Sequence, residues 1–282
     1  MLRLMLRGSV LGRVGLLCAA LLAAGSALAA PVSDARLEAF LRVTGFDVAL
    51  ESMRLGATDA PQMLGLEASD FGLRWTQIAD EVFAPEAIRA EAKALLGAAL
   101  SPQMLEHAAE FYASALGLRL VAVENAAHAV ADTPQDVARG EALLAEMRAT
   151  GAARLQILQR MNHAIDPQNI GVEAMQEVQI RFLLAASDAG VIARIDEAAL
   201  RSLMQEQASA LAEEIEQLSL AAAARIYEPF SDAELLRYAQ ALEHPTMQQV
   251  YELMNGVQNL LTGTRYEQLA LRLAELGPAQ EL

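Results

Sequence analysis

Two stretches of the sequence decide the fold: SPQMLEHAAEFYASALG (residues 101–117) and SDAELLRYAQALEHPTM (residues 231–247). Each opens on a serine, whose hydroxyl can accept a hydrogen bond from the first free amides of a helix. In the first stretch Pro102 follows the serine, at a helix position where no amide donor is needed. In the second stretch Ser231 and Glu234 have the spacing of a capping box. Both stretches therefore predict the start of a helix.

The two stretches resemble one structural unit that occurs twice, 130 residues apart. Both are preceded by an apolar residue, and both carry an apolar stripe after the serine. The same offset aligns four pairs of identical residues: Ser101 with Ser231, Leu105 with Leu235, Ala109 with Ala239, and Asn125 with Asn255. We therefore predict a duplication; the alternative is two unrelated helical segments with ordinary caps.

Each predicted helix is expected to break before a second helix resumes. In the first stretch the break is predicted at Gly117, which tolerates backbone angles that other residues resist. In the second it is predicted at Pro245, which lacks an amide donor and crowds the preceding turn. Upstream, FLRVT from Phe40 matches FLLAA from Phe182 at an offset of 142. A single deletion in the second copy, at the place that corresponds to the Gly-containing connection 56–72 of the first copy, would account for the difference between the offsets of 130 and 142.

The composition predicts an all-α fold. Good helix formers dominate, runs of β-branched and aromatic residues are scarce, and no segment alternates like a strand between turn signals. Further helix starts are expected after Ser33, at Pro85 and after Thr133, and a long helix is expected to end before Pro229. The chain is long enough to bury a sizeable core. We therefore expect a helical bundle built from two degenerate helix-turn-helix repeats.

The first thirty residues have the features of a cleavable export signal. Three arginines (Arg3, Arg7 and Arg13) precede an uncharged apolar stretch that is shorter than the roughly 20 residues a membrane span needs. Ala27-Leu28-Ala29 then gives the small-x-small pattern that signal peptidase recognises. The alternative is a retained membrane anchor. The predicted organisation is a signal peptide over residues 1–29, a first helical repeat over 30–130, and a connecting helix with the second repeat over 131–282.

Cleavage would leave a chain without cysteine and with a strong negative charge. Cys18 is the only cysteine, and leucines precede it where a lipoprotein signal has small residues. Removal of residues 1–29 takes away three of the 21 basic residues and none of the 36 acidic ones, which leaves a net charge of −18. Such a surface repels phosphate backbones and anionic headgroups, which argues against nucleic acid and membrane partners. We expect a periplasmic protein held together by packing rather than by disulfides.

The sequence contains no recognisable catalytic, cofactor or metal motif. No two histidines have the i, i+4 spacing of a helical metal pair; the four are His107, His128, His163 and His244. His107 and Glu110 share a helix face, which offers two ligands at most and is typical of solvated groups. The only lysine, Lys93, lacks the glycines of a phosphate loop. A solvated helix face is expected for three carboxylates, Glu213, Glu214 and Glu216. We therefore expect no cofactor, no metal and no enzymatic activity.

Two sets of side chains are compatible with a ligand cavity, which is the alternative to a filled core. Methionines in the predicted helices can line a promiscuous apolar groove; they include Met161, Met247 and Met254. The second set is aromatic and comprises Phe111, Tyr112, Tyr227 and Tyr251. At these spacings both sets are more typical of helices packed together, which is the interpretation we favour.

The first stretch is similar to the domain-of-unknown-function family 2059 of exported bacterial proteins. That family has an apolar residue and a serine at the helix start, a leucine four positions on, and then Phe-Tyr-x-Ser-Pro-x-Gly. The corresponding residues here are Leu100, Ser101, Leu105, Phe111, Tyr112, Ser114 and Gly117. The chain departs from this pattern at Ala115, where proline is usual, and at Leu118, where a polar residue is usual.

The resemblance extends more weakly to other segments. LRVTG, from Leu41, resembles the opening segment of the family. The second stretch keeps Phe230, Ser231, Glu234, Leu235 and Pro245, but it has Ala241-Leu242 in place of the aromatic pair and Met247 in place of the glycine. The resemblance implies a helical exported domain without an established function, so it supplies no catalytic residue.

Three functions are compatible with these observations. We favour a non-enzymatic binding or support module of the bacterial envelope, whose partner is an envelope protein. The second is a carrier or sensor of an apolar ligand held between the two repeats. The third is an enzyme whose site assembles only in three dimensions. A cavity would support the carrier, and convergent carboxylates with perturbed pKa values in a cleft would support the enzyme.

The mature exported protein is expected to begin at Ala30. Ala27 and Ala29 satisfy the peptidase, whereas cleavage one residue later would leave Pro31 at the new terminus. N-terminal sequencing of the exported protein measures this directly. An intact Met1 would contradict the export signal, and a fatty-acylated Cys18 would show an anchored protein instead.

Overall fold

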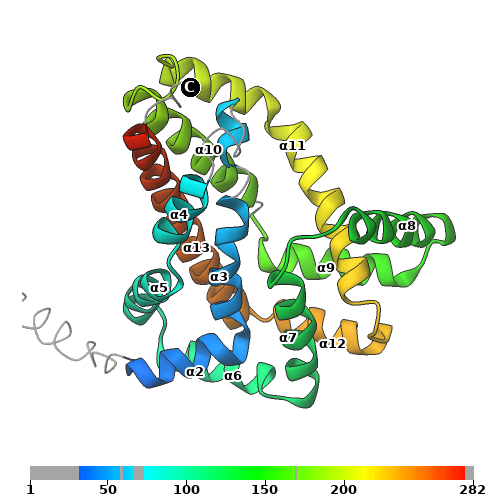
Figure 1. Cartoon of the computed structure of the whole chain (residues 1–282). Coiled ribbons are helices and arrows are strands. Elements are labelled where there is room, and N and C mark those ends of the chain that lie inside the picture. Colours follow the sequence, from blue (N-terminus) through cyan, green and yellow to red (C-terminus); the bar gives the residue numbers. More distant parts are fainter. Residues whose placement is uncertain (1–31, 58–59, 66–72, 169, 277–282) are drawn as a thin grey trace, which may run out of the picture. The chain divides into compact units, whose positions relative to one another are not determined.

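Helices form every regular element in the residues that the computed structural model describes, namely 32–57, 60–65, 73–168 and 170–276 (Figure 1). The all-α fold predicted from the composition is confirmed over these ranges. None of the described helices is both long enough and apolar enough to cross a membrane. The predicted signal peptide, with Cys18 and the cleavage residues Ala29 and Ala30, lies outside the described residues.

The first helices begin and end where the local signals place them. Ser33 caps α2 (Asp34–Thr44) by accepting a hydrogen bond from the Arg36 amide, and the helix ends at Gly45 with φ of 73°. This bend requires glycine, because a Cβ there would also lie 2.3 Å from the Asn125 Oδ1 atom. The elements that follow are α3 (Phe46–Ala57), η1 (Ala60–Leu64), α4 (Leu73–Val82) and α5 (Pro85–Ala99), the last with Pro85 in its first turn as predicted.

The two capping serines start helices as predicted. Ser101 caps α6 (Pro102–Tyr112), and its Oγ atom accepts from the Met104 amide at 3.2 Å. Ser231 caps α12 (Asp232–Leu242) through the predicted capping box, in which Glu234 accepts from the Ser231 amide at 2.9 Å. Each helix therefore has a side-chain partner for an amide that its own backbone leaves free.

The break after α6 lies at Ala113–Ser114, so the prediction of a break at Gly117 is wrong. Ser114 caps the next helix, α7 (Ala115–His128), and accepts from the Gly117 amide at 3.1 Å. Gly117 lies in the first turn of α7, where a Cβ would be 2.3 Å from the Phe111 carbonyl oxygen. The glycine therefore permits close approach of the two helices and does not itself cause the bend.

The second stretch breaks at the equivalent place. α12 ends at Leu242, and α13 (Pro245–Leu276) begins at Pro245, with the Nδ1 atom of His244 accepting from the Thr246 amide at 3.2 Å. The connection Glu243–His244 is 130 positions after Ala113–Ser114, so helix, break and helix recur in the same order. The duplication itself stays a prediction.

The upstream helices pair differently from the sequence alignment. α2, which contains Phe40, packs on α6, whereas α10 (Ile170–Asp188), which contains Phe182, packs mainly on α13 and on α11 (Glu197–Ile226). The helix that packs on α12 is instead α9 (Ala153–Ile165). The contacts therefore do not support the pairing of Phe40 with Phe182; they make α9 the counterpart of α2.

Helix α8 (Pro134–Thr150) begins at the predicted cap, Thr133, and packs closely on α11. A Cβ on Gly140 would lie 2.5 Å from the Ala221 carbonyl oxygen, so the two helix backbones nearly touch there. Gly151, with φ of 62°, ends α8 and separates it from α9. This break was not predicted from the sequence. The long helix α11 ends before Pro229, as predicted.

Helix α13 is the element around which the others are arranged (Figure 1). Its packing partners are α3, α4, α5, α6, α9, α10 and α12. Its buried side chains include Met247, Val250, Leu261, Leu269 and Leu273. Residues Val32–Leu282 group as one unit by their contacts, and both predicted repeats contribute to one core. The predicted boundary between residues 130 and 131 falls in the α7–α8 connection inside this unit.

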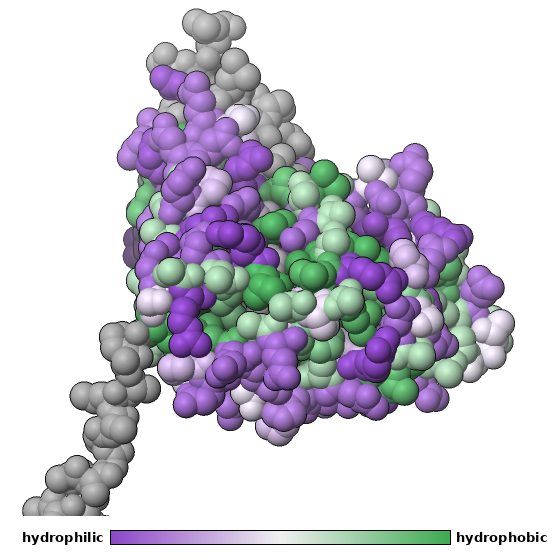
Figure 2. All heavy atoms as spheres, turned by 90° about the horizontal axis from the view of Figure 1, so that it is seen from below, coloured by the Kyte–Doolittle hydropathy of each residue, from purple (hydrophilic) through white to green (hydrophobic). Residues whose placement is uncertain are grey.

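Figure 2 shows the face that α2, α6, α7 and α12 present when the protein is seen from below. Apolar side chains gather in the middle of this face, and hydrophilic ones follow its borders. The large apolar residues that are most exposed lie on several helices, and they include Leu118, Val130, Leu203, Leu218 and Leu271. Single exposed apolar residues of this kind are normal on a protein surface.

Gly117→Ala is expected to destabilise the protein by roughly 1–3 kcal/mol, the usual cost of overpacking. The physical reason is that the new Cβ would meet backbone atoms of Phe111 and Tyr112, which cannot move aside. The matched control is Gly256→Ala in α13, where no neighbour lies within 4 Å; alanine should gain about 0.5–1 kcal/mol there. Urea unfolding midpoints measure both. Equal effects of the two substitutions would contradict the close packing of α6 on α7.

Candidate functional site

Four of the five tyrosines form one hydrogen-bonded network with the carboxylate of Glu124. The hydroxyls of Tyr227 and Tyr238 donate to its Oε1 atom at 2.8 Å and 3.0 Å. The hydroxyls of Tyr112 and Tyr251 share a hydrogen bond of 2.5 Å and lie 3.3 Å and 3.5 Å from the Tyr238 hydroxyl. We call these five residues the tyrosine–glutamate cluster.

The cluster draws its residues from five helices of both predicted repeats. Tyr112 closes α6, Glu124 lies on α7, and Tyr227 is the C-cap of α11. Tyr238 lies on α12 and Tyr251 on α13. Because each residue belongs to a packed helix or its cap, the hydroxyl groups are held in place before any ligand arrives.

Neighbouring aromatic rings keep the tyrosine rings in place. The ring of Phe111 stacks on that of Tyr238, with centroids 5.6 Å apart and planes 8° from parallel. The ring of Tyr227 meets that of Tyr238 edge to face at 6.1 Å. Such ring pairs stabilise by roughly 0.5–1.5 kcal/mol beyond their buried area. The hydroxyl positions are thus fixed by packing as well as by hydrogen bonds.

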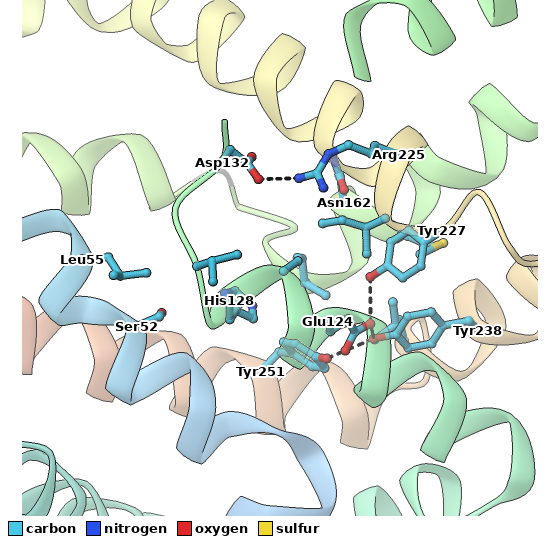
Figure 3. Close-up of a pocket in the computed structure, with 16 residues that line it drawn as sticks. Ser52, Leu55, Glu124, His128, Asp132, Asn162, Arg225, Tyr227, Tyr238 and Tyr251 are labelled. Carbon is cyan, nitrogen blue, oxygen red and sulfur yellow. Dashed lines mark hydrogen bonds and ion pairs between the residues drawn. The ribbon is translucent and has the colours of Figure 1, made fainter. Parts of the chain in front are cut away.

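Four residues of the tyrosine–glutamate cluster, all except Tyr112, line a pocket of about 450 Å³ and form its floor (Figure 3). In the figure Tyr227, Tyr238 and Tyr251 surround Glu124, and α3 carries Ser52 and Leu55 on the opposite wall. The remaining lining residues come mainly from α7, α9, α11 and α12 and include Ala127, His128, Met161, Asn162, Ile165 and Leu242. We call this space the Glu124 pocket.

An ion pair borders the Glu124 pocket on the side away from the tyrosines. Arg225 on α11 pairs with Asp132 at 2.5 Å (Figure 3), and the same guanidinium lies 3.5 Å from the carboxylate of Asp136. Asp132 precedes the cap of α8, so the pair ties the α7–α8 connection to α11. Arg225 is therefore shared between two carboxylates.

The surroundings shift the protonation of the cluster toward neutral forms. Burial raises the pKa of Glu124, and the hydrogen bonds from Tyr227 and Tyr238 oppose that rise. Burial and the nearby Glu124 charge raise the pKa of Tyr251 to about 12, and the pKa values of the other cluster tyrosines also lie well above the usual range. The tyrosines therefore act as hydrogen-bond donors and not as bases at neutral pH.

One oxygen of Glu124 remains free to bind. Both tyrosine hydrogen bonds end on Oε1, and Oε2 accepts none from the residues that the structure describes. Within those residues no group of three or more histidine, cysteine or acidic side chains could hold a metal ion. The arrangement thus offers an acceptor oxygen to a hydrogen-bond donor, beside the apolar side chains of Leu55, Ile165 and Leu242.

Among the residues singled out from the sequence, three of the four aromatic residues meet at this site. Tyr112, Tyr227 and Tyr251 belong to the cluster, and Phe111 packs against it. Ser114 caps α7 at the α6–α7 break, and Gly117 in the first turn of α7 permits close approach to the Phe111–Tyr112 backbone. The other repeat residues support the helices at a distance: Ser101, Leu105, Ser231, Leu235 and Pro245 cap, pack or start them.

The other candidate groups lie apart from the Glu124 pocket. The rings of His107 and His244 lie 4.2 Å apart, a pairing that their sequence positions did not predict. Glu234 binds Arg119 at 2.5 Å in addition to its capping role. Lys93 pairs with Asp34 and Glu38. Among the remaining candidates, exposed positions are occupied by His163, Glu213, Glu214 and Glu216.

Glu124, Tyr238 and Arg225 were not predicted from the sequence. Each sits in an ordinary helical pattern, and no local motif marks it. One signal was present: tyrosine is rare in this chain, and most of its tyrosines lie near positions 112 and 227–251. Scarce aromatic residues at those two places, which the repeat alignment brings together, point to a shared site.

A larger groove of about 1220 Å³ runs between the first half of α13 and the α9–α10 connection. Its lining mixes amide and carboxylate side chains, among them Gln248, Glu252 and Asn255, with apolar ones such as Leu253 and Val257. Asn255 donates to the Ile165 carbonyl at 2.9 Å and so serves the fold. We assign the candidate site to the Glu124 pocket, because a carboxylate with a raised pKa lies there among tyrosine hydroxyls from several helices.

One comparison with known proteins gives a match over part of the chain. Residues 86–146 match a family model described as "Uncharacterized protein conserved in bacteria (DUF2059)". The match confirms the resemblance drawn from the first stretch, and it covers Tyr112, Glu124 and His128. The other three tyrosines of the cluster lie beyond the matched residues. No curated protein and no solved structure matches the chain.

Glu124→Gln is expected to stabilise the protein relative to wild type, increasingly as pH rises. The folded state raises the pKa of Glu124, so protonation supports folding at low pH and that support is lost as pH rises through the raised pKa. Glutamine keeps an oxygen for the tyrosine donors and does not titrate. Urea unfolding at about pH 5 and pH 8 measures the difference in free energy of unfolding between the two proteins. The effects of the other titrating groups are the same in both proteins and cancel in this comparison.

The control for this experiment is Glu213→Gln, which removes an exposed carboxylate of α11. Its effect on the free energy of unfolding should be small and nearly the same at both pH values. A Glu124→Gln effect that is equally independent of pH would contradict the raised pKa.

Proposed function

We propose that this protein is an exported binding protein that holds a small molecule in the Glu124 pocket. The observation that carries the proposal is the Oε2 atom of Glu124, which belongs to the lining of the pocket and accepts no hydrogen bond from the described residues. Desolvation raises the pKa of Glu124, and a carboxylate in such surroundings is stabilised by a further hydrogen bond. A ligand with a donor group would satisfy it.

The composition of the pocket supports this function. Its volume of about 450 Å³ lies within the range of small-molecule sites, which is roughly 300–1,000 Å³. Apolar side chains such as Leu55, Met161 and Ile165 form part of the wall, and a few polar groups converge at the floor. Sites of this composition bind a ligand through its apolar body and orient it through one or two polar contacts.

The fold around the pocket supports a prearranged site. The floor is tied together by hydrogen bonds between residues 103 to 139 positions apart, such as Tyr227 with Glu124 and Tyr112 with Tyr251. Little ordering is then required when a ligand binds, which leaves more of the contact energy for affinity. The site also lies where both predicted repeats meet, as the carrier hypothesis requires.

The chemistry of the lining favours binding over catalysis. The tyrosine hydroxyls keep their protons, because their pKa values are raised. Ser52, a hydroxyl that lines the pocket, donates to the Ala49 carbonyl at 2.7 Å, and among the described residues it meets no base. Nucleophilic catalysis needs a base within hydrogen-bond reach of the nucleophile. A carrier or sensor therefore fits these residues better than an enzyme.

The proposed location of this binding protein is the periplasm. The basic, apolar and small-residue segments of the first thirty residues support export. The high negative charge supports a protein that stays in solution within the envelope, because it opposes adsorption to anionic lipids.

Filling the pocket is expected to abolish ligand binding. Ala127 lines the pocket on α7, whereas its neighbour Ala126 is exposed and does not line it. A compound library of neutral, anionic and cationic small molecules should contain members that raise the Tm of wild type and of Ala126→Phe, but not of Ala127→Phe. A ligand present at 100 times its Kd stabilises a protein by about 2.7 kcal/mol, which such a screen detects.

A second filling variant, Leu55→Trp, approaches the pocket from α3 and guards against a folding defect in Ala127→Phe. Circular dichroism confirms that each variant is folded. If compounds stabilise the filled variants as strongly as wild type, binding occurs elsewhere. If no compound of any class stabilises wild type, the proposed function is wrong.

A further inference from the structure

Glu124 carries a charge that no described residue balances. Its partners are the neutral hydroxyls of Tyr227 and Tyr238, and no ion pair of Glu124 forms within the described residues. Burying a carboxylate without a counter-charge is unfavourable, which is the reason that its pKa is raised. The missing component of this site is therefore a positive charge and not merely a hydrogen-bond donor.

The rest of the pocket does not provide that charge. Arg225 is the only arginine or lysine among its described lining residues, and it is shared between the carboxylates of Asp132 and Asp136. Desolvation lowers the pKa of His128, so its imidazole is neutral at neutral pH. Counted together, Glu124 and the group around Arg225 bring an excess of negative charge to the pocket.

The aromatic rings at the floor favour the same ligand. Tyr227, Tyr238 and Tyr251 line the pocket, and tyrosine rings attract cations that lie over their faces. The field of the whole chain, with its formal net charge of −15, also draws cations and repels anions. An anionic ligand would meet repulsion from Glu124, and a neutral one would leave the carboxylate unbalanced.

We propose that the Glu124 pocket recognises a small molecule that carries a protonated amine, with the ammonium donating to Oε2 of Glu124 and an apolar body against Leu55, Ile165 and Leu242. This inference rests on the proposed function and names its ligand class. It assigns to Glu124 the role of counter-charge, to the tyrosines that of holding the carboxylate in place, and to the Arg225 group that of bordering the site.

Proton release on binding gives this ligand class a distinctive signature. An ammonium beside Glu124 favours its ionised form, so binding releases the proton that the empty site retains at lower pH. Affinity for an amine therefore rises with pH through the raised pKa of Glu124, as long as the amine itself stays protonated. The other titratable side chains that line the pocket are Tyr227, Tyr238, Tyr251, His128, Asp132 and Arg225. The pKa values of the tyrosines are raised and that of His128 is lowered, so comparison with Glu124→Gln isolates the contribution of Glu124.

The test is calorimetry with three probes of one shape: phenethylamine, 2-phenylethanol and phenylacetate. The amine is expected to bind wild type at least tenfold more tightly than the alcohol, because a charge-assisted hydrogen bond is about twice as strong as a neutral one. The carboxylate is expected not to bind. As the pH rises through the raised pKa of Glu124, the affinity for the amine should rise, while that for the alcohol stays constant.

Two variants isolate the charge from the shape of the site. Glu124→Gln keeps an oxygen at the same place and is expected to bring the amine and the alcohol within twofold of each other. Tyr227→Phe removes one donor but keeps the carboxylate, so it should retain the preference for the amine. Loss of the preference in Tyr227→Phe alone, or its survival in Glu124→Gln, would overturn the assignment to the Glu124 charge.

The outcomes separate this inference from the proposed function. The deciding compounds in the screen are those that stabilise wild type but not Ala127→Phe. If these compounds are neutral or anionic, and the amine does not bind, the ligand class is wrong while the binding function stands. If no compound of any charge binds in either experiment, both are wrong. If the amine binds wild type and the filled variants Ala127→Phe and Leu55→Trp equally, the amine lies outside the pocket and the inference fails.

Discussion

The hydrogen bonds between Glu124 and its tyrosines are the constraint on which the arrangement of the helices depends. Helices rich in alanine and leucine pack against one another in several registers of similar energy, because apolar contacts have little direction. A buried carboxylate is different, since it must meet its donors within hydrogen-bond distance or pay the cost of desolvation. By engaging residues of α6, α7, α11, α12 and α13, the tyrosine–glutamate cluster selects one register for all five helices.

Helix boundaries could be predicted from the sequence because their causes are local. Ser33, Ser101 and Ser231 lie within a few residues of the amides that they cap, so the pattern alone identifies them. The same holds for the all-α class, which follows from helix propensity summed along the chain. The site could not be predicted in this way: Glu124 meets Tyr238 across 114 positions, and nothing near either residue records the other. Only the aromatic residues, which are scarce, indicated where the halves meet.

Gly117 shows how a correct signal can support a wrong mechanism. Its position near the end of the first helical pattern predicted a break caused by backbone freedom, yet Ser114 starts the new helix and Gly117 lies inside it. Glycine is needed at this position because a Cβ would collide with the backbone of Phe111 and Tyr112. That contact is tertiary in origin, so the sequence showed that a small residue was present without showing why. The close approach in turn places Tyr112 and Glu124, which are on adjoining helices, in one cluster.

The predicted duplication gives the cluster a further meaning. At the offset of 130, Glu124 corresponds to Met254, Tyr112 to Leu242, Tyr238 to Ala108 and Tyr251 to Val121. All four counterparts are apolar and buried. If the halves arose by duplication, the polar groups occupy one set of equivalent positions and apolar side chains occupy the other, and one of those side chains, Leu242, lines the Glu124 pocket. A network that served stability alone would have no reason to differ between equivalent positions. The concentration of polar groups beside one pocket is the distribution that the proposed binding site would require.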